Sequence, residues 1–186
     1  MAQNNTANAS ITKGLIGGYC FVAPVGTPLP TDATTPLNAA FQNVGYLDDS
    51  GVVHSHSANT TNFNDLNGDN IETASSEQER TMALRFAEMN EVALKEQYGD
   101  DNVTVDDQTG LIIFIGNNKK MPHKSVVLEL VLKDERRWRR VFPDCAVTEW
   151  SDQTDVSTAL AGGGVTYTKY ADASGNFEYN YLEVEA

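Results

Sequence analysis

Residues 124–142 read KSVVLELVLKDERRWRRVF, and this stretch contains the most regular pattern in the chain. In its first half, apolar side chains recur at every second position, which is the period of a β-strand with one buried face: Val126, Leu128, Leu130 and Leu132. Asp134-Glu135 then gives a turn signal, and residues 136–142 have the length of a second strand. The stretch therefore predicts a strand, a turn and another strand.

Shorter strand patterns lie on both sides of this stretch, separated by turn residues. They occupy residues 18–23, 81–87, 102–105, 110–115, 145–150, 165–170 and 177–183, and residues 41–57 predict a hairpin that turns at Asp48-Asp49-Ser50-Gly51. One short helix is predicted at about residues 90–98, because Asn90 can cap its start and Gly99 can end it. This pattern predicts a mainly β fold, a β-sandwich or barrel with one flanking helix. No linker divides the chain, so we expect one domain over residues 1–186.

Three segments lack a strand or helix pattern. Residues 1–13 are predicted to be a flexible N-terminal tail. Residues 24–38 contain four prolines and predict an extended loop, and the polar residues 59–76 predict a second loop that turns at Asn67-Gly68. Both loops are longer than a compact monomer needs, so we expect them to become ordered by docking on neighbouring subunits.

The charge distribution indicates which partners the chain can have. The net charge is −13, yet residues 133–140 carry five basic side chains against two acidic ones, which leaves −16 on the rest. A stable nucleic-acid complex is not expected from such a chain. No apolar run approaches the length of a membrane span and no export signal is present, so we expect folding in the cytoplasm. Cys20 and Cys145 are expected to be reduced and packed.

The sequence contains no motif of a common enzyme class, and we expect neither catalysis nor a cofactor. His54, His56 and His123 could form a metal site, but an exposed strand face is the favoured interpretation. Residues 64–70 resemble a calcium loop, yet Ala74 occupies the position that requires a glutamate, and a tight turn is favoured.

Arg136, Arg137, Arg139 and Arg140 form the most conspicuous cluster in the sequence. Arginine binds carboxylates with two parallel hydrogen bonds, and most of the chain is acidic. A contact with another subunit is therefore favoured over a solvated face, and both are favoured over nucleic-acid binding.

The order of three segments resembles the major tail protein, the tail tube subunit, of long-tailed siphophages. The first segment is a strand that enters a proline-rich loop, residues 18–30. The second is VGYLDDSGV at residues 44–52, followed by a polar stretch with Asn67-Gly68-Asp69. The third is the strand-to-helix unit from Thr81 to Gly99. Together they cover about the first two-thirds of the chain, and the region after Lys124 matches only in being rich in strands.

The resemblance implies a structural virion protein that is assembled in the host cytoplasm. It implies rings of six copies that stack into a hollow tube, which conducts the genome during ejection without binding the DNA. It also implies a tape-measure protein, a tail terminator and distal tail proteins as partners. On this basis we expect the arginine cluster to meet acidic loops of a neighbouring ring. We expect four acidic side chains to face the lumen: Asp48, Asp49, Asp65 and Asp69.

Two other functions are compatible with the sequence. A capsid decoration or stabilising protein would form closed oligomers rather than tubes. A surface carbohydrate-binding module is suggested by the Asn- and Thr-rich loops and by the aromatic residues Phe177, Tyr179 and Tyr181, which are favoured as core residues.

Overall fold

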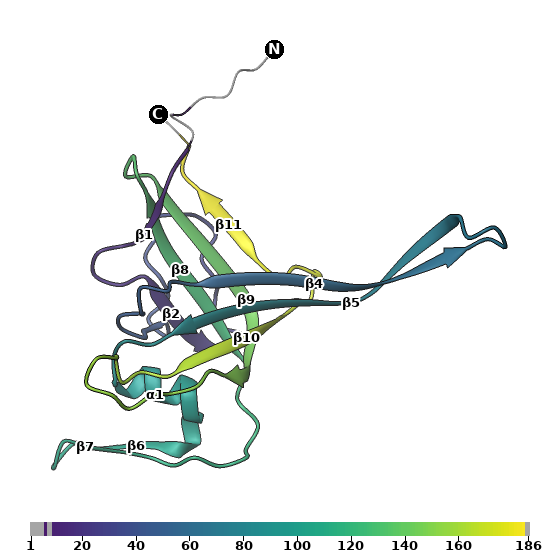
Figure 1. The fold of residues 1–186 in the computed structure, drawn as a ribbon. Coiled ribbons are helices and arrows are strands. Elements are labelled where there is room, and N and C mark those ends of the chain that lie inside the picture. Colours follow the sequence, from purple (N-terminus) through teal and green to yellow (C-terminus); the bar gives the residue numbers. More distant parts are fainter. Residues whose placement is uncertain (1–5, 7–8, 185–186) are drawn as a thin grey trace.

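The computed structural model describes Thr6 and residues 9–184, and its centre is a long antiparallel pair of strands (Figure 1). These are β8 (Lys124–Leu132) and β9 (Arg137–Trp150), joined by a tight turn at Asp134-Glu135. The strand, turn and strand predicted for residues 124–142 are confirmed. The two strands predicted at 136–142 and 145–150 form one continuous strand, β9, which begins at Arg137.

Pro143 lies inside β9, where a proline would normally interrupt a sheet. It falls at an irregularity in the pairing with β8, between the register pairs Val126↔Phe142 and Lys124↔Cys145. The neighbours of β9 also change there, from β11 (Tyr179–Leu182) before it to β10 (Gly164–Tyr170) after it. Proline has no backbone N–H to donate to a neighbouring strand. Because Pro143 lies where the regular hydrogen bonding between β8 and β9 is interrupted, β9 tolerates the proline.

Nine strands form one sheet with the order β3-β2-β8-β9-β10-β5-β4, while β1 pairs with β8 and β11 pairs with β9. The remaining strands of this sheet are β1 (Thr12–Gly14), β2 (Cys20–Pro24), β3 (Gln42–Asn43), β4 (Val53–Asn64) and β5 (Asn70–Arg85). Every strand pair is antiparallel. The predicted mainly β fold with one short helix is confirmed, and its architecture is consistent with a β-sandwich.

The helix α1 (Glu91–Tyr98) begins and ends at the predicted residues. The Asn90 side chain accepts a hydrogen bond from the N–H of Ala93 at 2.9 Å, and Gly99 has a φ of 92°, which favours glycine. A single 3₁₀ turn (Asp100–Asn102) follows, and then the separate two-stranded sheet of β6 (Val103–Asp106) and β7 (Leu111–Phe114). The strands predicted at 102–105 and 110–115 are confirmed.

Apolar side chains cover both faces of β8. Val126 and Leu128 belong to the larger core cluster, which includes Phe86, Phe142 and Tyr167. Val127 points to the opposite face and packs in a second cluster, to which the residues after β2 contribute. Its members and packed neighbours are Phe21, Ala23, Leu29, Leu37, Phe41, Val141, Tyr179 and Tyr181.

The loop 24–38 therefore covers its own sheet. Ala33 is buried, Leu29 and Leu37 pack on the second cluster, and the Asp32 carbonyl accepts a hydrogen bond from Arg139. The prediction that this loop becomes ordered only on a neighbouring subunit is wrong, because its spaced apolar residues find a partner face within the chain.

The predicted hairpin at 41–57 is also wrong. The turn exists, with the Gly51 N–H donating to the Asp48 carbonyl at 3.1 Å, but it joins strands that do not pair with each other. β3 pairs with β2, whereas β4 pairs with β5. Val44, between them, is fully buried in the main core, which directs the chain away from a local hairpin.

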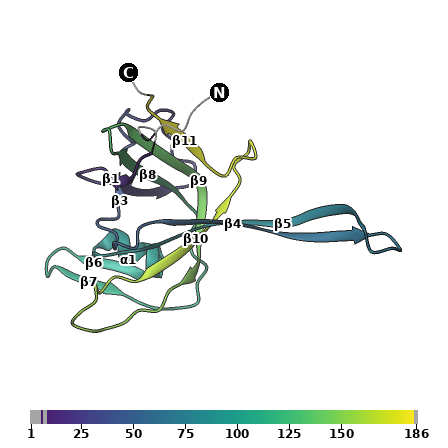
Figure 2. The same cartoon turned by 45° about the horizontal axis from the view of Figure 1, so that its top comes forward.

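The largest departure from the sequence prediction is the segment 59–76, which is a hairpin rather than a loop. β4 and β5 pair from Val53↔Ala83 out to Asn64↔Asn70, and Figures 1 and 2 show this hairpin projecting far from the rest of the chain. We call residues 57–79 the arm. Its strands are held by backbone pairing and carry few apolar residues to bury, so no apolar alternation marks them in the sequence.

The predicted tail, residues 1–13, falls partly outside the described residues, at 1–5 and 7–8. Its last two residues, Thr12 and Lys13, lie in β1 and pair with Leu132 and Val131. No helix in the described part of the chain is long and apolar enough to cross a membrane.

Candidate assembly surfaces

The arm exposes almost all of its side chains to solvent. β10 pairs with β5 from Arg85 to Thr81. Between Arg80 and Asn70, β4 is the one described strand that pairs with β5. At its base, the Arg80 guanidinium lies 4.2 Å from the centre of the Phe177 ring, which links the arm to the segment before β11. The arm is therefore anchored at one end and free of the body along the rest of its length.

The arm ends in a well-formed turn. The Asp65 N–H donates to the Asp69 carbonyl at 2.8 Å, and the Asp65 carboxylate accepts from the N–H groups of Asn67 and Asp69 at 2.8 and 2.9 Å. These hydrogen bonds lower the pKa of Asp65. The predicted turn at Asn67-Gly68 is confirmed, and Asp65 stabilises it.

Three apolar side chains are exposed at this end of the arm: Phe63, Leu66 and Ile71. We call them the arm tip. Leu66 is completely exposed, and its neighbours in the arm are polar. A gathering of apolar side chains at the end of a polar projection indicates a contact surface. Sequence reasoning missed it, although three apolar residues within a polar stretch were a visible signal.

The four arginines differ in their surroundings. Arg139 is only 3% exposed: it donates to the Glu129 carboxylate at 2.7 Å and to the Asp32 carbonyl at 2.8 Å. Arg140 pairs with Glu178 at 3.2 Å. These two arginines have partners within their own chain, and their role in a subunit contact stays a prediction.

Arg137 is the first residue of β9, Arg136 lies directly before it, and both are half-buried. Arg136 donates to Asp134 across the turn at 2.5 Å. A subunit contact through these two residues also stays a prediction.

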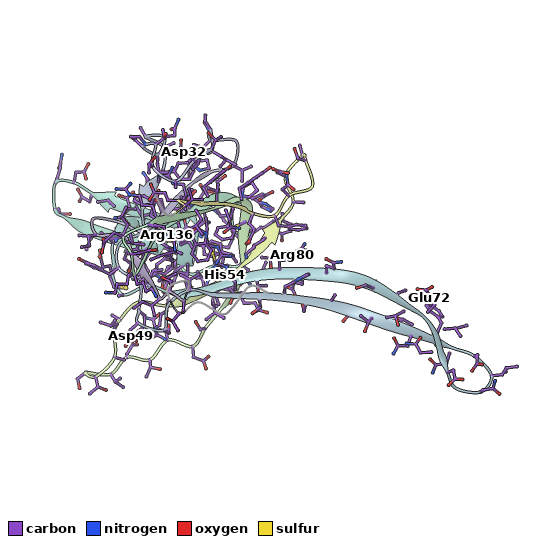
Figure 3. All side chains as sticks on the ribbon, turned by 90° about the horizontal axis from the view of Figure 1, so that it is seen from above. Asp32, Asp49, His54, Glu72, Arg80 and Arg136 are labelled. Carbon is purple, nitrogen blue, oxygen red and sulfur yellow. The ribbon has the colours of Figure 1, made fainter. Side chains whose placement is uncertain are left out.

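The four acidic residues expected at a lumen lie in two groups. Figure 3 shows Asp49 on the body and Glu72 far out on the arm, where Asp65 and Asp69 form the end turn. Asp48, next to Asp49, accepts from the Ser50 N–H at 2.9 Å and so stabilises its own turn. The four do not gather within one subunit, and a position facing a lumen stays a prediction.

The three histidines have different neighbours. His54 stacks on Phe142 with ring centres 5.5 Å apart, and it accepts a hydrogen bond from Lys169. His56 contacts Gln78, while His123 pairs with Asp144 at 2.6 Å. No group of three or more His, Cys, Asp or Glu side chains that could hold a metal occurs among the described residues.

A buried ionic cluster fastens α1 to the sheet. The Lys124 ammonium donates to Glu96 and to Asp100, each at 2.6 Å, and the Tyr167 hydroxyl donates to the other Glu96 oxygen at 2.7 Å. Burial lowers the pKa of Lys124, but the two carboxylates outweigh that effect and raise it overall. Lys124 therefore stays charged, and it holds the helix at one place on β8.

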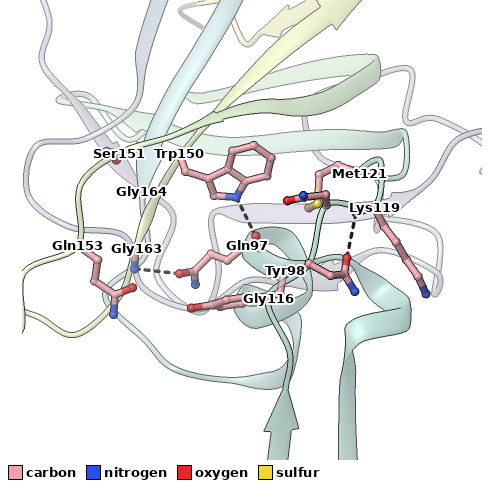
Figure 4. Close-up of a pocket in the computed structure, with 12 residues that line it drawn as sticks. Gln97, Tyr98, Gly116, Lys119, Met121, Trp150, Ser151, Gln153, Gly163 and Gly164 are labelled. Carbon is pink, nitrogen blue, oxygen red and sulfur yellow. Dashed lines mark hydrogen bonds between the residues drawn. The ribbon is translucent and has the colours of Figure 1, made fainter.

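Beside α1 lies a pocket of about 530 Å³, shown in Figure 4. Its lining residues are Gln97, Tyr98, Gly116, Asn117, Asn118, Lys119, Met121, Trp150, Ser151, Gln153, Gly163 and Gly164. Trp150 is 54% exposed, yet its indole N–H donates to the Gln97 carbonyl at 2.8 Å, so the ring is fixed in place. Sequence reasoning did not identify this pocket, because its residues come from four separate segments.

Glycines 162–164 bring the last wall of the pocket close to α1. A Cβ on Gly162 would lie 1.8 Å from the Phe86 carbonyl oxygen, and the Gly163 N–H donates to the Gln97 side chain at 3.0 Å. This run of three glycines therefore allows the segment to pack closely against Phe86 and Gln97.

The sequence was compared with known proteins. The model of a family described as phage tail tube protein matches residues 1–185. No curated protein matches the chain.

Proposed function

The chain belongs to the phage tail tube protein family, whose members are structural proteins of the virion tail, and we propose that its copies form hexameric rings that stack into the tube. The genome would pass through this tube from the capsid to the host. The six-fold ring follows from the resemblance to siphophage tail proteins.

The observation that carries the proposal is the arm. It holds an apolar tip far from its own body, where no described residue of the same subunit covers it (Figure 2). We propose that the surface that receives the tip belongs to another copy. A contact between two different surfaces of one chain is heterologous, and such contacts produce rings or open filaments rather than closed dimers.

The edges of the sheet support the same assembly. β3 and β4 end the strand order, and β1 and β11 each pair on one side with β8 and β9 respectively. Unpaired strand edges favour pairing with further chains. Sheets that continue from one subunit to the next would cover these edges and close the ring.

The charge of the chain suits a conduit. A wall that repels phosphates lets DNA pass without adhering, and the chain carries a net −13. We propose that Asp48, Asp49, Asp65 and Asp69 face the lumen. We also propose that Arg136 and Arg137 meet acidic side chains of a neighbouring ring.

The remaining partners are proposed from the resemblance. A tape-measure protein would occupy the tube during assembly, and a terminator and distal tail proteins would close its two ends. Assembly would take place in the host cytoplasm.

Electron microscopy of the concentrated protein tests this function. We expect hollow tubes with a regular axial repeat and six-fold symmetry in cross-section. A matched variant in which Asn59–Ser76 is replaced by Asn-Gly should remain folded and form no tubes. Closed oligomers of limited size from the full chain would instead favour a capsid decoration protein.

A further inference from the structure

We propose that the pocket beside α1 receives the arm tip of a second copy of this chain, with Leu66 inserted next to Trp150. The inference rests on the proposed function, since it assigns both halves of one contact between subunits of the tube.

The arm tip has the properties of an inserted group. Leu66 is fully exposed, and Phe63 and Ile71 beside it are more than half exposed. The hydrogen-bonded turn at Asp65 fixes the backbone that presents Leu66. An apolar side chain on an ordered turn loses little conformational freedom when it binds.

The pocket has the properties of a receiving site for apolar side chains. Its volume of about 530 Å³ is many times the roughly 30 Å³ that one water molecule occupies in the liquid. Tyr98, Met121 and Trp150 supply apolar surface, and Figure 4 shows the Trp150 indole near the Gln97 side chain. Tryptophan, tyrosine and methionine are enriched in the buried centres of protein interfaces.

The polar groups of the lining favour a protein side chain over a sugar. The Gln97 amide is already used, because its oxygen accepts from Gly163 and its nitrogen donates to the Ala93 carbonyl. Asn117 exchanges two hydrogen bonds with Asn102. Since a sugar must satisfy its hydroxyl groups, a lining in which the Gln97 and Asn117 amides are already paired suits an apolar ligand better.

The charges of the two surfaces are complementary. Asp65, Asp69 and Glu72 surround the tip, and no basic residue occurs from Ser57 to Ser76. Lys119 is the charged residue in the pocket lining; its side chain is 63% exposed and reaches Asp101 only at 4.0 Å. An acidic tip is therefore drawn to the lysine at the rim.

Disulfide trapping tests the contact directly. Leu66→Cys and Asn118→Cys, introduced into separate copies that are mixed and assembled, should form a covalent dimer under mild oxidation. Ile16→Cys is the matched control for Leu66→Cys, because Ile16 is also fully exposed, and it should give no dimer with Asn118→Cys. The native thiols, Cys20 and Cys145, are buried and do not interfere.

The outcomes separate this inference from the proposed function. If the wild-type protein forms no tubes, the proposed function fails. If tubes form but Leu66→Cys links only to itself, or Asn118→Cys links equally well to Ile16→Cys, the function stands and the pocket is not the receiving site.

A second measurement uses assembly itself. Leu66→Asp should raise the protein concentration needed for tubes by about tenfold or more, because the contact loses a buried leucine and gains a charge. Ile16→Asp should leave that concentration unchanged. If Leu66→Asp assembles normally while a soluble glucose polymer quenches Trp150 fluorescence in a Trp138→Phe protein, the pocket binds sugar and the inference is overturned.

Discussion

Replacing Lys124 by methionine should destabilise the protein strongly, although Lys124 is a charged residue at the end of a strand. Methionine keeps the length of the side chain and removes the ammonium that lies 2.6 Å from both Glu96 and Asp100. Glu96 is 2% exposed and would keep only the hydrogen bond from Tyr167. Breaking a buried ion pair in this way costs about 3–5 kcal/mol, which is a large part of the roughly 5–15 kcal/mol that stabilises a typical domain.

Urea denaturation followed by circular dichroism measures this change. With a slope of about 2–3 kcal/mol per M, the transition midpoint should fall by about 1–2.5 M. Lys119→Met is the control, since Lys119 is exposed and its ion pair at 4.0 Å should contribute at most about 0.5 kcal/mol. The double variant Glu96→Gln with Lys124→Met should recover much of the loss. A loss below about 1 kcal/mol for Lys124→Met would refute the assignment of this cluster as the anchor of α1.

Three further predictions concern other buried groups. Burial, together with Arg140 and Lys169, lowers the pKa of His54 to about 4, although Glu178 opposes this. The unfolded chain then binds a proton at higher pH than the folded one, so the unfolding free energy should fall between about pH 6.5 and 4, and a His54→Gln protein should lack that part of the decrease. Burial raises the pKa of the Cys20 and Cys145 thiols, so maleimide should label them only after denaturation; rapid labelling of native protein would contradict the packing. Arg139→Glu should lower the urea midpoint sharply, whereas Arg137→Glu should leave it nearly unchanged and weaken tube formation in electron micrographs.

Local signals predicted the regular elements of the fold well. The cap at Asn90 and the stop at Gly99 defined α1 to the residue, because both act through neighbouring backbone groups. The apolar pattern along 124–133 likewise located β8, although the structure packs both faces of this strand against apolar clusters rather than one.

The arm and the arginine partners show where such signals fail. Residues 59–76 form strands by pairing with each other in solvent, so no buried face leaves a pattern in the sequence. The partner of Arg139 was not recoverable either: a two-residue turn at Asp134-Glu135 would place Glu129 opposite Arg140, whereas the register in the structure is centred on Asp134 and pairs Glu129 with Arg139. The contact with Asp32 was not recoverable, because it depends on how a distant loop folds over the sheet.

The direct test of subunit assembly through the arm is a cryo-electron microscopy reconstruction of the assembled protein. We predict that each arm crosses onto a neighbouring copy and that Leu66 lies against Trp150 of that copy. Arms that end in solvent, or that fold against the subunit from which they come, would contradict it.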